Sequence, residues 1–252
     1  MHIYLVHLGR VPYAEGLAIQ ARVVAARKQG AIGDTLLLLE HPPVITLGRN
    51  SSRANVVASD EFLAARGVEL HEINRGGDVT YHGPGQLVGY PIVDLRGEFP
   101  GKRGPHLGPV DFVRMLEEVL IRTCGDFGVL AKRIPGVTGV FTFGGSPQAG
   151  TTPDEKLREK KLAAIGVHVS QGVTSHGFAL NVTTDLREFE WIVPCGIVDR
   201  GVSSLELEAS KPVTMEAAVH SAARNFGRVF ARQVVWAESL DVLLEQSALK
   251  RP

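Results

Sequence analysis

The chain has 252 residues, of which 44% are hydrophobic and 21% charged, a composition typical of a globular protein with a substantial core. Its 27 basic and 27 acidic residues balance, so the overall charge does not favour nucleic acid or an anionic membrane as a partner. The longest apolar runs, such as residues 35–39, are too short to span a bilayer, and the N-terminal residues lack a signal-peptide pattern.

The first half of the chain predicts strands and helices that alternate without a regular period. In chain order we expect a strand at residues 1–8, a helix at 13–29 that Gly30 ends, a strand at 34–47 interrupted by His41-Pro42-Pro43, a short helix from Ser59 to Ala65, and a strand at 68–73. A loop over residues 75–86 follows, because four of these twelve residues are glycine.

The second half predicts further strands and two long helices. We expect a strand at 87–95, a helix at 109–124, strands at 138–143, 161–170 and 176–182, a helix from Thr214 to about 229, and a short C-terminal helix. We expect residues 144–160 to form a long exposed excursion. The fold class is therefore α/β (α+β), a mixed β-sheet core flanked by helices, with residues 1–252 as a single domain.

The cysteines are two, which is too few for a disulfide framework and favours a reducing compartment, the cytoplasm. Cys124 lies on a predicted helix and is interpreted as structural. Cys195 lies in a turn between Pro194 and Gly196, which presents a side chain to a cavity. The residues alone leave open whether Cys195 is reactive or a small buried cysteine.

Lys161 begins the predicted strand 161–170 and shares one face with Ala163, Ile165, Val167 and Val169 under strict alternation. An ammonium on an apolar face costs several kcal/mol unless it is paired. The alternative is that Lys161 extends from the strand end into water. A nearby ammonium would lower the pKa of a cysteine from about 8.5, but the spacing does not show that Lys161 and Cys195 meet.

The segment RGGDVTYHGPGQ at residues 75–86 is unusually rich in special residues. A tight surface turn would explain its glycines but not its Arg, Thr, Tyr, His and Gln. A loop with free N–H groups beside a basic residue suits an anionic or carbonyl oxygen. The spacing matches neither a phosphate-binding P-loop nor a dinucleotide-binding fingerprint.

The histidines bear on two further questions: whether His176 belongs to a site, and whether the chain binds a metal. His176 precedes Gly177 at the start of an apolar strand, and it is either a satisfied hydrogen-bond donor or part of a site. The nine histidines show neither HExxH nor zinc-finger spacing, so we expect no metal site.

Three segments together resemble the octanoyltransferase family, also called lipoyl-protein ligase type B. RGGDVTYHGPGQLVGYP, KLAAIGVHVSQGVTSHGFALNV and PCGI follow one another in the order and at the separations of that family, and the resemblance extends from about Thr46 to Ser204. It implies the α/β fold of the lipoate and biotin protein ligases. The three motifs together are highly specific, although none would suffice alone.

The resemblance also implies roles for particular residues. Cys195 would be the nucleophile that carries the acyl group, and Lys161 the partner that lowers its pKa. The acyl pocket would be formed by Arg75, Gly76, Gly77, Asp78, Val79, Thr80, Tyr81, His82, Ala164, Ile165, Gly166, Gly177, Phe178 and Ala179. The implied donor is octanoyl-acyl carrier protein, and the implied acceptors are lipoyl domains of 2-oxoacid dehydrogenase complexes and the glycine cleavage H protein, with no cofactor.

Two features separate the chain from the ATP-using ligases of the same fold. Those ligases carry Asp directly after the motif histidine, where this chain has Gly83, and their lysine motif reads differently from KLAAIG. The segment 144–160 departs from the family pattern because it is longer than the short turn expected there. Lys160 is a second candidate for the motif lysine, and the following Ala-Ala-Ile-Gly favours Lys161.

Three alternatives remain beside the transferase. They are an ATP-dependent lipoate or biotin ligase, a non-catalytic module that binds acyl chains or lipoyl domains, and a cysteine hydrolase with His82 or His176 as its base. An acidic carrier protein would favour a basic surface, for which Arg96, Lys102 and Arg103 are the candidates, against the simpler interpretation of a solvated face.

Overall fold

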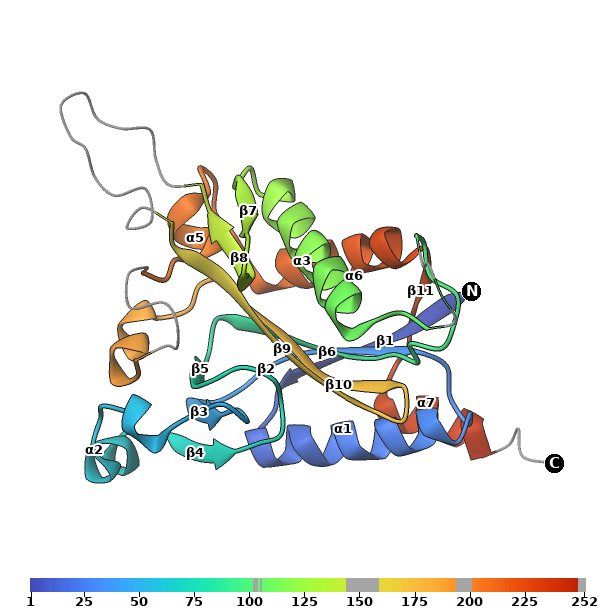
Figure 1. Cartoon of the computed structure of the whole chain (residues 1–252), viewed down its shortest axis with the longest axis horizontal. Helices are drawn as coiled ribbons and strands as arrows, with labels where there is room; N and C mark the ends of the chain where they lie inside the picture. Colours follow the sequence, from blue (N-terminus) through green and yellow to red (C-terminus); the bar gives the residue numbers. More distant parts are fainter. Residues whose placement is uncertain (102–103, 105, 144–158, 194–200, 249–252) are drawn as a thin grey trace.

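The computed structural model describes residues 1–101, 104, 106–143, 159–193 and 201–248. Within these residues, the largest element is an eight-stranded mixed sheet with the order β11-β1-β2-β6-β10-β9-β8-β7 (Figure 1). Its strands are β1 (His2–Arg10), β2 (Thr35–Glu40), β6 (Gln86–Ile92), β7 (Ala131–Ile134), β8 (Val137–Thr142), β9 (Lys161–Ser170), β10 (Val173–Asn181) and β11 (Gln233–Trp236). β1 pairs parallel with β2 and β11, and the other pairs are antiparallel.

Two layers of helices cover this sheet, one on each face (Figure 1). On one face lie α3 (Pro109–Asp126) and α6 (Met215–Phe230), and on the other lie α1 (Tyr13–Lys28) and α7 (Leu240–Ala248). The strand β2 is buried on both faces: Leu36 and Leu38 join the core under α3 and α6, and Leu37 and Leu39 join the core under α1. This two-residue period explains why a continuous apolar run forms a central strand.

A smaller sheet lies beside the large one and has the strand order β4-β3-β5. It consists of β3 (Val44–Leu47), β4 (Glu69–Glu72) and β5 (Thr80–His82), next to α2 (Asp60–Ala65) and the 3-10 helix η1 (Arg53–Asn55). The break predicted at His41-Pro42-Pro43 is confirmed, because the chain leaves the large sheet after β2 and enters the small sheet at β3. The Ser59 hydroxyl accepts a hydrogen bond from the Phe62 N–H (3.2 Å), which confirms the predicted cap of α2.

The prediction that residues 75–86 are all loop was wrong. Thr80, Tyr81 and His82 pair with β3 as β5, and Gln86 begins β6. These three residues have side chains that suit a strand, and the glycines lie outside the strand on either side of it. The glycine-rich composition therefore describes two turns around a short strand.

Besides β5, two strands were missed, both at the edges of the large sheet: β7 and β11. The remaining predicted elements are present with ends shifted by up to three residues, and β9 has the predicted bounds. Two further short helices, η2 (Leu186–Trp191) and α5 (Leu205–Glu208), lie on either side of residues 194–200, which fall outside the described part of the chain. Among the described helices, none has the length and apolar character needed to cross a bilayer.

The alternation expected along β9 does not extend to Lys161. The pairing of β8 with β9 shifts by one residue, so that Val140 pairs with Ala163 but Phe141 pairs with Lys161. An extra residue in one strand reverses the faces beyond it. Ala163 accordingly lies in the core under α3, whereas Lys161 lines a pocket.

Candidate active site

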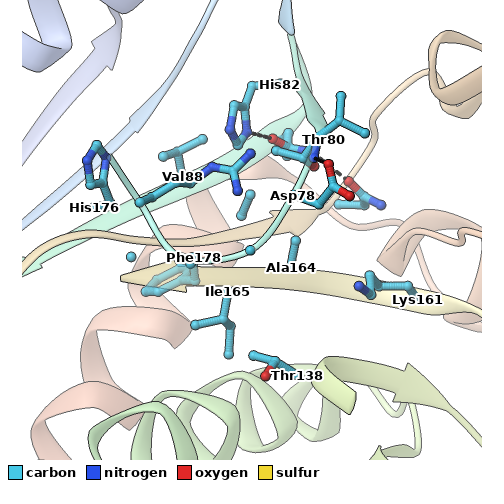
Figure 2. Close-up of a pocket in the computed structure, with 18 of the residues that line it drawn as sticks. Asp78, Thr80, His82, Val88, Thr138, Lys161, Ala164, Ile165, His176 and Phe178 are labelled. Carbon is cyan, nitrogen blue, oxygen red and sulfur yellow. Dashed lines mark hydrogen bonds between the residues drawn. The ribbon is translucent and has the colours of Figure 1, made fainter. Parts of the chain in front are cut away.

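A pocket of about 400 Å³ lies where the small sheet meets strands β6, β9 and β10 of the large one (Figure 2). Of the residues predicted for the site, it is lined by Arg75, Gly77, Asp78, Val79, Thr80, His82, Lys161, Ala164, Ile165, Gly166, Gly177, Phe178 and Ala179. The segment around Arg75 and the distant strands β9 and β10 thus meet at one cavity. A size of this order is typical of small-molecule sites.

Two of the predicted site residues that the structure describes do not line the pocket. Gly76 donates its N–H to the Val167 carbonyl (3.1 Å). The Tyr81 ring is fully buried in the core of the small sheet. Cys195 lies outside the described residues.

The sequence missed several residues that line the pocket. These are Tyr13, Asn50, Val88, Tyr90, Gly136, Val137, Thr138, Asn181, Phe189 and Val202. For β6 a signal was present, because Gln86, Val88 and Tyr90 alternate along one strand face. For Tyr13 at the start of α1 there was none, since only the fold brings it to the cavity.

Arg75 is buried at the pocket wall. Its Nη2 donates to the carbonyl and the hydroxyl of Thr46, both at 2.9 Å. Its Nε has no hydrogen-bond partner among the described residues, and no described carboxylate forms an ion pair with it. Burial lowers the pKa of Arg75, although a guanidinium stays charged at neutral pH. Arg75 thus provides positive charge in a largely buried cavity.

Small residues make room for this side chain. A Cβ on Gly166 would lie 3.1 Å from Arg75 Cδ, and one on Gly48 would lie 2.8 Å from Arg75 Nη1. Asp78, in the same loop, accepts hydrogen bonds from the Asn55 side-chain amide (3.0 and 3.2 Å). The loop is therefore held on both sides of Arg75.

His82 is oriented by a chain of hydrogen bonds. Its Nδ1 lies 2.7 Å from Gln86 Oε1, and Gln86 Nε2 donates to Asn181 Oδ1 (3.0 Å). Because the amide oxygen only accepts, Nδ1 carries the proton and Nε2 has a free lone pair. Burial, and then the neighbouring His41, lower the pKa of His82 to about 3. His82 is therefore neutral at physiological pH.

His176 has an unusual backbone and a defined partner. Its φ is 55°, its N–H donates to Gln20 Oε1 (2.7 Å), and its Nε2 donates to Asn74 Oδ1 (2.8 Å). His176 is thus a satisfied donor, and the same residue also lines the pocket, so the two interpretations do not exclude each other. Burial, and then the charge of Arg75, lower the pKa of His176 to about 4.

Lys161 lies at one end of the pocket (Figure 2). Its N–H donates to the Gly201 carbonyl and its carbonyl accepts from the Ser203 N–H, both at 2.9 Å. Its Nζ lies 5.3 Å from the centre of the Phe141 ring. Gly139, at φ 128°, leaves space for the lysine, because a Cβ there would lie 3.3 Å from Lys161 Cε.

The chain on either side of residues 194–200 borders the same pocket. Phe189 in η2 and Val202 both line it, and the Val193 N–H donates to the Asn55 carbonyl (2.7 Å). η2 is held by Tyr81, whose hydroxyl donates to the Glu188 carboxylate and whose ring packs edge-on against Phe189. Both described ends of this segment are thus fixed at the cavity wall.

The remaining predicted residues lie away from the pocket. Cys124 is fully buried in the core under α3 and α6, and burial raises its pKa to about 12, as expected of a structural cysteine. Arg96 is held by Asp94 through two hydrogen bonds of 2.8 and 2.7 Å. Lys102 and Arg103 lie outside the described residues. Among those that are described, no group of three His, Cys, Asp or Glu side chains is arranged to hold a metal ion.

Residues 12–227 match the family model of the lipoyl protein ligase A/B catalytic domain. An octanoyltransferase of Acidobacterium capsulatum is 63% identical over 251 residues, covering 98% of each chain. The chain belongs to the octanoyltransferases of the lipoyl protein ligase A/B family. An octanoyltransferase of Koribacter versatilis is 54% identical over 242 residues, covering 96% of this chain and 90% of that one.

Solved structures of low sequence identity share the fold. A bipartite lipoate protein ligase from Thermoplasma acidophilum superimposes with a TM-score of 0.67 at 16% identity, covering 100% of this octanoyltransferase and 93% of that chain. A lipoate-protein ligase A bound with ATP gives 0.64 at 16% identity, covering 100% and 96%. The predicted α/β fold with a mixed sheet is therefore confirmed.

Proposed function

We propose that this octanoyltransferase moves an octanoyl group from an acyl carrier protein thioester onto a lysine of a lipoyl domain, with Cys195 carrying the group in between. The observation that carries the proposal is the pocket, which brings the family-like segments around Arg75 and from Lys161 to Val182 together, with Lys161 at one end. The named relatives support the octanoyl group as cargo. The cytoplasm is the proposed setting.

The proposed chemistry has two steps. The Cys195 thiolate attacks the thioester carbonyl, the carrier thiol leaves, and an octanoyl-cysteine thioester forms. The target lysine amine then attacks this thioester, the cysteine thiolate leaves, and an amide remains. Transfer from a thioester to an amine is downhill, so the sequence of steps needs no ATP.

Lys161 has two roles in this proposal. As an ammonium it lowers the pKa of the Cys195 thiol and gives its proton to the departing carrier thiolate. As the resulting neutral amine it then accepts the proton that the attacking lysine loses. Its main chain is hydrogen bonded to Gly201, which immediately follows the segment that contains Cys195. This bond supports a short path between the two side chains.

The hydrolase alternative needs a histidine base, and the two histidines of the pocket are poorly suited to that role. The pKa of His82 is lowered to about 3 and that of His176 to about 4, whereas an effective general base titrates near the working pH. Nε2 of His176 is also occupied by Asn74. The pocket therefore favours transfer with Lys161 as the proton acceptor.

The proposed partners are both proteins. The donor is octanoyl-acyl carrier protein, and the acceptors are lipoyl domains of 2-oxoacid dehydrogenase complexes and the glycine cleavage H protein. The structural relative from Thermoplasma acidophilum is described with its E2 lipoyl domain, which supports an acceptor of this class. For the carrier, Arg96→Glu tests the proposed basic surface, since it should raise the KM for the carrier at low salt, and an unchanged KM would remove Arg96 from it.

Intact mass spectrometry tests the nucleophile. The protein is mixed with octanoyl-acyl carrier protein in the absence of ATP, and an octanoyl adduct is expected on the unmodified chain and on Cys124→Ala, but not on Cys195→Ser. Addition of a lipoyl domain should then discharge the adduct. The absence of any adduct, together with transfer of free octanoate when ATP is present, would refute the proposal in favour of a ligase.

A further inference from the structure

The end of the pocket opposite Lys161 is closed. Figure 2 shows Lys161 at one end of the cavity, and His176, Val88 and His82 toward the other. The residues at that far end are buried, with Val88 at 1% and Tyr90 at 5% exposure. An acyl chain whose carbonyl reacts beside Lys161 would therefore extend toward them.

Aromatic rings form the closed end. The ring of Tyr13 is stacked parallel to that of His82, with centroids 6.2 Å apart. Behind them His41 contacts Tyr13 edge-on at 5.0 Å and lies 6.0 Å from Tyr90. These rings come from the start of α1, from the turn after β2, from β5 and from β6. We call Tyr13, His41, His82 and Tyr90 the ring cluster.

Hydrogen bonds fix the ring cluster. His41 Nδ1 donates to the Val11 carbonyl (2.7 Å), so the Tyr90 hydroxyl donates to His41 Nε2 (2.7 Å). Helix α1 packs directly on this histidine, because a Cβ on Gly16 would lie 2.9 Å from His41 Cε1. The ring cluster cannot recede without moving α1, so it limits the length of the cavity.

Polar atoms at the same end add to this limit. Arg75 Nε is buried without a partner among the described residues, and the Tyr13 hydroxyl forms no hydrogen bond with another described residue. The free lone pair of His82 Nε2 lies in the same pocket. Such atoms need water, and a longer apolar chain would displace that water without replacing its hydrogen bonds.

We propose that the ring cluster, together with Val88 two residues before Tyr90 on β6, is the stop that sets acyl-chain length, so that chains longer than eight carbons are rejected by contact with Tyr13, Val88 and Tyr90. This inference rests on the proposed function, since it takes octanoyl as the cargo and the Lys161 end as the reacting end. It places selection at the closed end of the cavity and not at the wall beside Lys161, where Val202 lies.

A matched pair of substitutions tests the position of the stop. Val88→Ala and Val202→Ala each remove two methyl groups from the pocket lining, the first at the closed end and the second beside Lys161, with which Val202 forms a β-bridge. Octanoyl- and decanoyl-acyl carrier protein compete in one reaction, and the products on a lipoyl domain are counted by mass. The ratio cancels any loss of folded enzyme.

We expect the decanoyl-to-octanoyl ratio to rise about tenfold in Val88→Ala, the discrimination carried by two methylenes, and to stay unchanged in Val202→Ala. Tyr13→Phe, which removes a hydroxyl but adds no space, should raise the ratio by a smaller factor. An unchanged ratio in Val88→Ala, or a larger rise in Val202→Ala, would overturn the proposed stop.

A second measurement separates this inference from the proposed function. The melting temperature with free octanoate or decanoate reports binding without any transfer step, because a ligand stabilises the folded state that binds it. Octanoate should stabilise the unmodified chain more than decanoate, and Val88→Ala should reverse that order. If these stabilisation effects are seen but no octanoyl transfer occurs, the proposed function is refuted and the stop is supported. If transfer occurs but neither the stabilisation nor the product ratio depends on chain length as expected, the stop is refuted and the proposed function is supported.

Discussion

Acidification from pH 7 to pH 5 should destabilise this protein through His82 and His176. Burial is the main cause that lowers the pKa of His82 to about 3 and that of His176 to about 4, whereas an unfolded histidine titrates near 6.5. Between 6.5 and the folded pKa, the unfolded state binds a proton that the folded state does not. The stability from each neutral histidine is thus complete above pH 6.5 and is lost as the pH falls toward 4 for His176 and 3 for His82.

The magnitude follows from the same two values. One pKa unit corresponds to about 1.4 kcal/mol, and at pH 5 the unfolded histidine is almost fully protonated while both folded histidines are almost fully neutral. Each histidine therefore lowers the free energy of unfolding by about 2 kcal/mol between pH 7 and pH 5, and the pair lowers it by about 4 kcal/mol.

Urea unfolding at pH 7 and pH 5, followed by circular dichroism, measures this difference. The controls are His82→Asn, whose amide can still donate to Gln86, and His176→Asn, since Asn tolerates the φ of 55° at that position. Each variant should lose about 2 kcal/mol less than the unmodified chain over the same pH interval. Equal losses in all three proteins would refute the assignment of the acid sensitivity to these histidines.

Three further predictions concern single side chains. Tyr90→Phe leaves His41 Nε2 buried without a donor and should cost about 1–3 kcal/mol in urea unfolding, and an unchanged midpoint would contradict this. Gly83→Ala places a Cβ 1.9 Å from the Tyr81 hydroxyl, so we expect a lowered melting temperature, and a fully stable variant would show that Tyr81 lies elsewhere. Cys124 should resist iodoacetamide in the native state because burial raises its pKa to about 12, which peptide mapping before and after unfolding can check.

The regular parts of the fold could be predicted because their periodicity agrees with their packing. In the helix at 109–126 the apolar positions Leu116, Val119 and Leu120 are buried as their helical spacing predicts, whereas Val110 in the first turn is exposed. β9 was predicted with its observed bounds. The edge strands β7 and β11 were missed because each has only four residues and is buried on few positions. Their strand conformation depends on pairing with β8 and β1, which the local sequence does not encode.

The site could be predicted where its residues are chemically unusual in sequence. The segment around Arg75 and the strand that begins at Lys161 stood out, because glycines and a strand-end lysine need an explanation. Tyr13, Phe189 and Val202 did not, since an isolated aromatic or aliphatic residue is most often core. Only the fold brings α1, η2 and the residues after the segment with Cys195 to one cavity.

This chain has glycine at position 83, where the ATP-using ligases have aspartate, and the side chain of Tyr81 depends on that glycine. The space that a side chain at Gly83 would occupy is filled by the Tyr81 hydroxyl, which donates to Glu188 in η2. An aspartate in that place would displace Tyr81 and remove the bond that holds η2. η2 leads directly into the segment with Cys195. The position of the proposed nucleophile therefore depends on the Tyr81 side chain, which in turn depends on the glycine at position 83. A Gly83→Asp exchange alone would therefore disturb the position of η2 before it could introduce ligase chemistry.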